Sequence, residues 1–138
     1  MGIACAALIP LECILDDAGK LQILELPINF VRVYYIAGVP TGSERGFHAH
    51  KTLHQVFLVP QGNVTLELIT PRTSQVYVLD EKVSRALYVP PGYWRVISDF
   101  SQDAICLVMA SQHYDENDYI RNFEDYTHWF NKVFTDES

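Results

Sequence analysis

Two histidines separated by a single residue, His48 and His50, are the residues of this sequence best suited to chemistry. In an extended segment, side chains two residues apart share a face, with roots about 7 Å apart. An imidazole can give or take a proton near neutral pH. The segment therefore predicts a proton-transfer pair or half of a metal site, with Phe47 and Ala49 on the opposite, packing face.

The residues around this pair are similar to the two signatures of the cupin fold. His-x-His is followed by Gln55 and Gly62, so that an amide stands where the metal-binding glutamate of the first signature would be. The second signature reappears at Pro90-Pro91-Gly92-Tyr93-Trp94-Arg95, in which Arg95 replaces the metal-binding histidine. A guanidinium is a permanent cation and repels a divalent ion. We therefore predict the fold without the metal.

A third histidine, His54, keeps a metal site open as an alternative. Together with His48 and His50 it could recruit an ion by itself. Because His54 alternates with Gln55 along an extended segment, we expect it to face away from the pocket.

The elements that must position these residues are short strands. We expect about ten of them, with turns about every 8 to 12 residues, as in a sandwich, barrel or jelly roll. The expected strands cover residues 7–14, 20–26, 30–36, 47–50, 55–59, 63–70, 75–79, 86–89, 94–97 and 104–110. Only the end is helical in pattern, because from Asn122 onward apolar residues recur at spacings of three and four. Asp118 or Asn122 could cap this helix. The predicted fold class is all-β, a cupin or double-stranded β-helix jelly roll with a C-terminal helix.

Size and composition favour one compact domain. The chain has 138 residues, of which 49% are hydrophobic and 12% aromatic, enough to bury one core. We divide it into N-terminal strands (1–26), a barrel (27–112) and a loop with the final helix (113–138). No apolar run approaches the length of a membrane span, and no secretory signal is recognisable, so we expect a cytoplasmic protein.

The charge of the chain limits its partners. A net charge of −7 argues against nucleic acid and acidic membranes as partners. It still allows one small anionic ligand, because a few arginines that converge on a pocket can prevail locally. The three cysteines lack C-x-x-C spacing, which favours buried, reduced thiols.

The heptapeptide Arg45-Gly46-Phe47-His48-Ala49-His50-Lys51 resembles a particular family. It is similar to the sugar 3,4-ketoisomerases, metal-independent cupins that act on dTDP-4-keto-6-deoxyglucose in the synthesis of deoxysugars for bacterial surface glycans, such as lipopolysaccharide O-antigen. The resemblance continues in Val33-Tyr34-Tyr35-Ile36, in Leu87-Tyr88-Val89-Pro90 and in Asp118-Tyr119-Ile120-Arg121. It implies an isomerase that moves a ketone from C4 to C3 through an enediolate and needs no cofactor.

The resemblance also implies roles for individual residues. We assign His50 to the carbon-bound proton and His48 to the proton shuttled between oxygens, with Tyr35 or Arg45 supporting the enediolate. The candidates for binding the nucleotide diphosphate and the sugar are Arg45, Lys51, Gln55, Arg95 and Arg121, while Trp94 or Tyr88 could stack on thymine or the sugar. Members of the family form homodimers in which N-terminal strands cross to the partner, and the apolar segment 7–14 would fit that role.

Three other functions remain open at this point. A nucleotide-sugar-binding cupin without catalysis would need the same pocket, and a related epimerase would use a different base without moving the carbonyl. A metal-dependent cupin would bind about one transition metal per chain. The sequence leaves open the configuration at C4 of the product and the identity of the nucleotide base.

Overall fold

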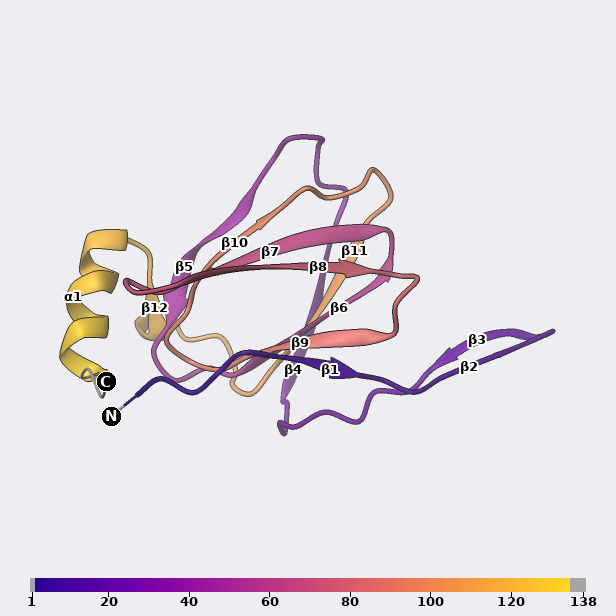
Figure 1. Ribbon diagram of the computed structural model, residues 1–138, viewed down its shortest axis with the longest axis horizontal. Helices are drawn as coiled ribbons and strands as arrows, with labels where there is room; N and C mark the ends of the chain where they lie inside the picture. Colours follow the sequence, from indigo (N-terminus) through magenta and orange to yellow (C-terminus); the bar gives the residue numbers. More distant parts are fainter. Residues whose placement is uncertain (1, 135–138) are drawn as a thin grey trace.

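The computed structural model describes residues 2–134, which form two five-stranded antiparallel sheets, a separate hairpin and one helix (Figure 1). The strands are β1 (Ala7–Pro10), β2 (Cys13–Asp16), β3 (Gly19–Gln22), β4 (Arg32–Ala37), β5 (Arg45–His50), β6 (Gln55–Gln61), β7 (Asn63–Ile69), β8 (Ser74–Asp80), β9 (Arg85–Val89), β10 (Trp94–Ser98), β11 (Ile105–Ala110) and β12 (Tyr119–Ile120). A 3₁₀ turn, η1 (Glu116–Asp118), precedes β12, and the helix is α1 (Phe123–Val133). The predicted jelly roll with a C-terminal helix is confirmed.

The two sheets enclose one main core. The first has the order β1-β9-β6-β11-β4 and the second the order β12-β5-β10-β7-β8. Alternation along β7 shows how the sequence builds this core, because Val64, Leu66 and Leu68 are almost fully buried while the residues between them are less so. They pack against buried residues of the opposite sheet, such as Phe57 and Val108. This alternation is expected of an antiparallel strand with one face on the core.

Strand β5 departs from simple alternation at its start. Phe47 has a φ of 57° and Gly46 a φ of 97°, and the pairing with β10 shifts register between Arg95 and Val96. Because of this bulge, Phe47 and Ala49 do not share a packing face, and that prediction was wrong. Ala49 is completely buried, whereas Phe47 is 46% exposed and lines the same cavity as the side chain that follows it.

Gly46 allows the neighbouring strands β5 and β10 to approach each other closely at this bulge. A Cβ atom at Gly46 would lie 2.8 Å from the carbonyl oxygen of Arg95, whereas one at Gly42, with a φ of 83°, would meet nothing within 4 Å. We expect Gly42→Ala to cost about 1 kcal/mol for its left-handed backbone alone and Gly46→Ala about 2–4 kcal/mol. Urea unfolding of both variants measures the difference, and equal losses would contradict the close approach.

The hairpin β2–β3, which follows β1, and the helix α1 lie outside the two five-stranded sheets, at opposite ends of the barrel (Figure 1). The hairpin β2–β3 projects from the barrel (Figure 1) and exposes Ile14, Leu15 and Leu21. At the other end α1 buries Tyr126 and Phe130, and the side chain of Asn122 caps it by accepting from the Asp125 backbone N–H. Within residues 2–134, no helix has the length and hydropathy needed to cross a bilayer.

Candidate functional site

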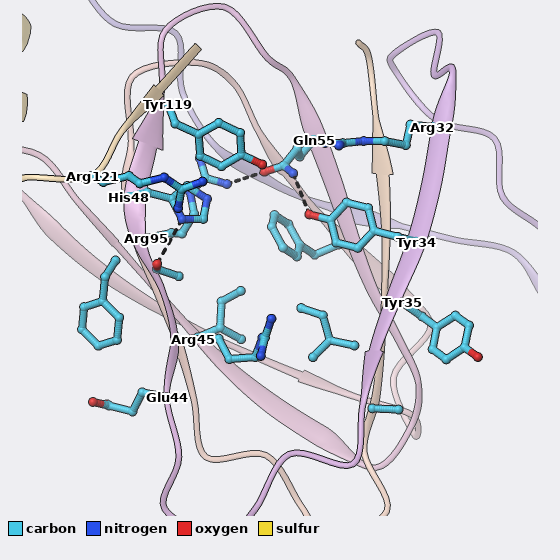
Figure 2. A pocket seen from close by; sticks show the side chains of 16 residues that line it. Arg32, Tyr34, Tyr35, Glu44, Arg45, His48, Gln55, Arg95, Tyr119 and Arg121 are labelled. Carbon is cyan, nitrogen blue, oxygen red and sulfur yellow. Dashed lines mark hydrogen bonds between the residues drawn. The ribbon is translucent and has the colours of Figure 1, made fainter. Parts of the chain in front are cut away.

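A cavity of about 750 Å³ opens between the sheets, lined from β4, β5, β6, β10, β12 and Arg121 (Figure 2). Of the residues predicted from the sequence, six line it: Tyr35, Arg45, His48, Gln55, Arg95 and Arg121. Gln55 and Arg95 reach it by strand alternation, because a strand turns every second side chain toward the interior.

The two histidines stand side by side at the back of this cavity, with ring centroids 5.0 Å apart and rings nearly perpendicular. His48 lines the cavity, whereas His50 lies behind it and is 1% exposed. The Nδ1 atom of His48 is 3.0 Å from the carbonyl oxygen of Gly46, and that of His50 is 3.0 Å from a carboxylate oxygen of Asp118. Because both partners can only accept, each ring carries its proton on Nδ1 and keeps a lone pair on Nε2.

Both imidazoles are held in the neutral, basic form. Burial and the positive charge of Arg95 lower the pKa of His48 from its ordinary value of 6.5 to about 4. The same two causes lower the pKa of His50 further. Desolvation and a nearby like charge both disfavour the imidazolium. At neutral pH the pair can therefore accept protons.

This depressed pKa makes stability depend on pH. Below pH 6.5 the unfolded chain binds a proton at His48 that the native state refuses until about pH 4, so the native state loses stability as the pH falls through this window. At pH 5 we expect a loss of about 2 kcal/mol from His48 alone, relative to pH 7. Urea unfolding at both pH values measures it. His48→Gln should show a smaller pH effect by that amount, and an unchanged pH effect would contradict the shift.

A buried arginine lies beside the histidines. Arg95 is 1% exposed and donates to the side-chain oxygen of Gln55 and, over 3.2 Å, to the carbonyl oxygen of Tyr93. Gln55 in turn donates to the Tyr34 hydroxyl over 3.0 Å. An amide can accept from a guanidinium and donate to a phenol at once, which a carboxylate cannot do. Burial lowers the pKa of Arg95 to about 10, so the guanidinium remains charged at neutral pH.

The cavity wall is positive although the chain is acidic. Arg32, Arg45, Arg95 and Arg121 line it against a single carboxylate, that of Glu44. The Nε atoms of Arg32 and Arg95 are buried without a hydrogen-bond partner among residues 2–134. Unpaired buried donors are costly, and a cluster of cations in a concave site is suited to a phosphate or an oxyanion.

The side chain of Arg121 is fixed at the cavity by Tyr119 and Glu116. Its guanidinium lies over the ring of Tyr119, 4.2 Å from the centroid, and donates twice to Glu116 over 2.9 Å. Tyr119 also packs against both histidines, with centroid distances of 4.9 Å and 4.3 Å. The segment before α1 thus completes the site.

Four predicted side chains point elsewhere. Tyr35 contributes to the rim of the cavity, but it is 68% exposed and its hydroxyl points away from the interior (Figure 2). Its neighbour Tyr34 points inward instead, because consecutive strand residues face opposite sides. Trp94 is buried against α1, 5.2 Å from the ring of Phe123. Lys51 follows β5 as an exposed residue and is not among the residues that line the cavity.

The fourth is Tyr88, whose side chain contacts His54 and is not among the residues that line the cavity. The His54 Nδ1 atom is 2.8 Å from the Tyr88 hydroxyl, and the two rings stack. Tyr88 packs with Val56 and Met109 in a cluster separate from the main core. His54 therefore does not join His48.

The residues present do not fit a metal ion. Of the four positions that hold the ion in the cupin signatures, two carry Gln55 and Arg95, which are bonded to each other. Within the described residues, no group of three or more His, Cys, Asp or Glu side chains is arranged to hold a metal. The guanidinium beside the two imidazoles would repel a divalent cation.

Besides Phe47, sequence reasoning missed four contributors to the site, namely Arg32, Tyr34, Asp118 and Tyr119. Arg32 and Tyr34 follow from alternation in β4, and the sequence already places them on one face. Asp118 and Tyr119 had no periodic signal, because they reach the histidines through the pairing of β12 with β5. Only the family resemblance indicated a role in the site for the tetrapeptide Asp118-Tyr119-Ile120-Arg121.

Comparisons with known proteins agree with this geometry. Residues 5–131 match the family model described as FdtA: WxcM-like, C-terminal. The chain is 37% identical, over 124 residues, to TDP-4-oxo-6-deoxy-alpha-D-glucose-3,4-oxoisomerase of Aneurinibacillus thermoaerophilus, with 87% of this chain and 88% of that protein covered.

Solved structures of the same kind superpose closely. One is the 3,4-ketoisomerase QdtA of Thermoanaerobacterium thermosaccharolyticum, a histidine-to-asparagine mutant in complex with TDP-4-keto-6-deoxyglucose. It has 38% identity, a TM-score of 0.90 and coverage of 95% of this chain and 97% of that one. Another is a 3,4-ketoisomerase of Helicobacter canadensis, with 31% identity, a TM-score of 0.86 and coverage of 91% and 97%.

Proposed function

We propose, on the premise that this chain belongs to the FdtA family of WxcM-like C-terminal domains, that it is a sugar 3,4-ketoisomerase acting on TDP-4-keto-6-deoxyglucose. The observation that carries the proposal is His48, a neutral imidazole with a free Nε2 lone pair in a cavity walled by arginines. The predicted isomerase of deoxysugar biosynthesis, with its ketone transfer from C4 to C3, is the function that the relatives support.

The reaction requires proton transfers only. A base removes the proton on C3, the electrons form an enediolate, and a proton returns to C4 while the hydroxyl proton moves from O3 to O4. Substrate and product are isomers, so the balance includes no external oxidant or reductant. Such a step needs an unprotonated base within reach of the substrate and fixed donors for the oxyanion.

The geometry favours dividing the work between the histidines in the opposite way to the sequence-based assignment. His48 lines the cavity, so we assign it the carbon-bound proton. His50 is buried behind it, with Nε2 unpaired, and we assign it the proton shuttled between oxygens. Tyr34 replaces Tyr35 as the hydroxyl that supports the enediolate, together with Arg95, to which it is linked through Gln55.

The remaining cations suit the nucleotide. Arg45 and Arg121 line the cavity and can bind the diphosphate, and Arg32 offers a third guanidinium. Because Trp94 and Tyr88 point elsewhere, Tyr119 and Phe47 are the better candidates for stacking on the sugar or base. Lys51 stays a candidate only for an approaching phosphate at the surface.

The direct test is conversion of the substrate. The protein, treated with a chelator, is incubated with TDP-4-keto-6-deoxyglucose, and the sugar is followed by NMR. We expect the carbonyl to move from C4 to C3, and the same spectra give the configuration at C4. Tight binding with no movement of the carbonyl would instead indicate a binding protein. Activity that disappears with the chelator and returns with a metal would indicate a metal-dependent cupin.

We further propose that the protein is a cytoplasmic homodimer in which the N-terminal segment, residues 1–26, contacts or exchanges with the partner. The hairpin β2–β3 projects from the barrel and leaves Leu15 74% exposed. Apolar side chains of this kind mark interaction surfaces when they gather.

The dimer can be tested at the hairpin. We expect Leu15→Glu to raise the dissociation constant of the dimer at least about tenfold, since a carboxylate would be buried at the interface. Sedimentation equilibrium measures the dissociation constant. The matched control is Val76→Glu, which changes an exposed valine (62%) on β8. A monomeric wild-type protein would overturn the proposal.

A further inference from the structure

The carboxylate of Asp118 contacts His50 with one oxygen and Thr52 with the other. Oδ2 is 3.0 Å from His50 Nδ1. Oδ1 accepts from the Thr52 backbone N–H over 2.7 Å and from the Thr52 hydroxyl over 2.8 Å. Asp118 is 8% exposed. Three donors thus fix this carboxylate in one orientation, away from solvent.

The backbone keeps Asp118 in this place independently of its side chain. The Lys51 N–H donates to the Asp118 carbonyl oxygen over 3.0 Å, and the Asp118 N–H donates over 3.0 Å to the carbonyl oxygen of Asp115, the residue before η1. The next residue, Tyr119, pairs with His50 in the ladder between β12 and β5. A substitution at the side chain therefore leaves residue 118 beside the imidazole.

We propose that Asp118 is a positioning residue that fixes the tautomer of His50, and that Thr52 fixes the orientation of Asp118. A carboxylate only accepts, so Nδ1 must carry the proton and Nε2 must present its lone pair. Nε2 is buried and has no hydrogen-bond partner among residues 2–134. No protein donor therefore competes for this lone pair. The catalytic part of the inference depends on the proposed isomerase function, whereas the tautomer itself does not.

The Thr52 backbone makes Asp118→Asn a sharp test. A backbone N–H can only donate, so it will hold the amide oxygen of the new side chain at the position of Oδ1. The NH₂ group then occupies the position of Oδ2 and donates to His50 Nδ1, which must become the acceptor. The proton moves to Nε2 and the lone pair needed for the shuttle is lost. Reversal of a tautomer by an aspartate-to-asparagine change cost about 10⁴-fold in kcat in a serine protease.

The primary measurement is the tautomer. Long-range ¹H–¹⁵N NMR of protein labelled in histidine reports which ring nitrogen is protonated, and the His50 signals are those lost in His50→Gln. We expect Nδ1–H in the wild type and Nε2–H in Asp118→Asn. Turnover should fall by about 10²–10⁴-fold, with TDP affinity changed less than about threefold because Asp118 does not line the cavity.

Asp115→Asn is the matched control. It changes an exposed carboxylate beside the same turn, which accepts from the Asn117 N–H and, among residues 2–134, from no other donor, and it should leave tautomer and turnover unchanged. A wild-type His50 tautomer in Asp118→Asn, or turnover above about a tenth of wild type, overturns the inference. If the wild type itself does not isomerise the sugar, the proposed function fails, while the NMR result still decides the role of Asp118.

A milder pair covers the case in which Asp118→Asn does not fold. Thr52→Val removes the hydroxyl donor but keeps the backbone N–H, and Thr52→Ser keeps both. We expect turnover to fall about 3–10-fold in Thr52→Val, matching the loss of one hydrogen bond of about 1 kcal/mol, and to recover in Thr52→Ser. Equal activity in the two variants would contradict the role of the Thr52 hydroxyl.

Discussion

His48→Asn should abolish most of the isomerisation while leaving nucleotide binding intact. We expect turnover to fall about 10³–10⁴-fold, the upper part of the range for loss of a positioned general base. An amide of similar size has no basic lone pair to take the proton from C3. The arginines and Tyr34 remain to stabilise the enediolate, which is why some activity should survive.

The measurement must separate chemistry from binding. Progress of the ketone is followed by NMR at saturating substrate, and TDP affinity is measured by calorimetry. We expect the dissociation constant for TDP to change less than about threefold. His113→Asn, which changes an exposed histidine of the loop before η1, is the control and should behave as wild type. Turnover above about a tenth of wild type in His48→Asn would show that another group is the base.

The parts of this site that the sequence could predict are those that follow from local alternation. His48, Gln55 and Arg95 lie on strands whose inward faces are set by a period of two. A signature with known spacing placed all three in one pocket. The fold class follows from the same kind of information, since short strands and regular turn residues favour a jelly roll.

The parts that could not be predicted depend on backbone irregularity or on distant pairing. Phe47 joins the cavity only because its left-handed backbone breaks the alternation of β5. Trp94 is turned toward α1 because its neighbour Arg95 takes the inward position. Asp118 meets His50 across 68 residues of sequence, and a contact of that range leaves no periodic pattern in either segment.

Arg95 affects both anion binding and the pKa of the histidines, because its positive charge attracts an anion and lowers the pKa of His48 and His50. The guanidinium is completely buried, and its hydrogen-bond acceptors, Gln55 and the Tyr93 carbonyl, are neutral. A buried cation without an anionic partner is costly to the fold. Its retention is understandable if an anion arrives with the substrate or forms during the reaction, and the enediolate is such an anion.

Arg95→Met is therefore expected to have a large effect on catalysis. Turnover should fall about 10²–10³-fold, the range for removal of an oxyanion-stabilising donor. The pKa of His48 should rise by about one unit, because the charge that helps to lower it to about 4 is gone while burial persists. The acidic limb of the pH–rate profile should move upward by the same amount.

A lysine at this position separates charge from geometry. Arg95→Lys keeps the cation but cannot reproduce the planar donor pair toward Gln55 and Tyr93. We expect it to keep the pKa of His48 near 4 and still lose about 10-fold or more in turnover. NMR titration of His48 in the three proteins gives the pKa values, and kinetics give the rates. If the pKa of His48 is the same in Arg95→Met as in the wild type, burial alone accounts for the lowered pKa and the coupling through Arg95 is refuted.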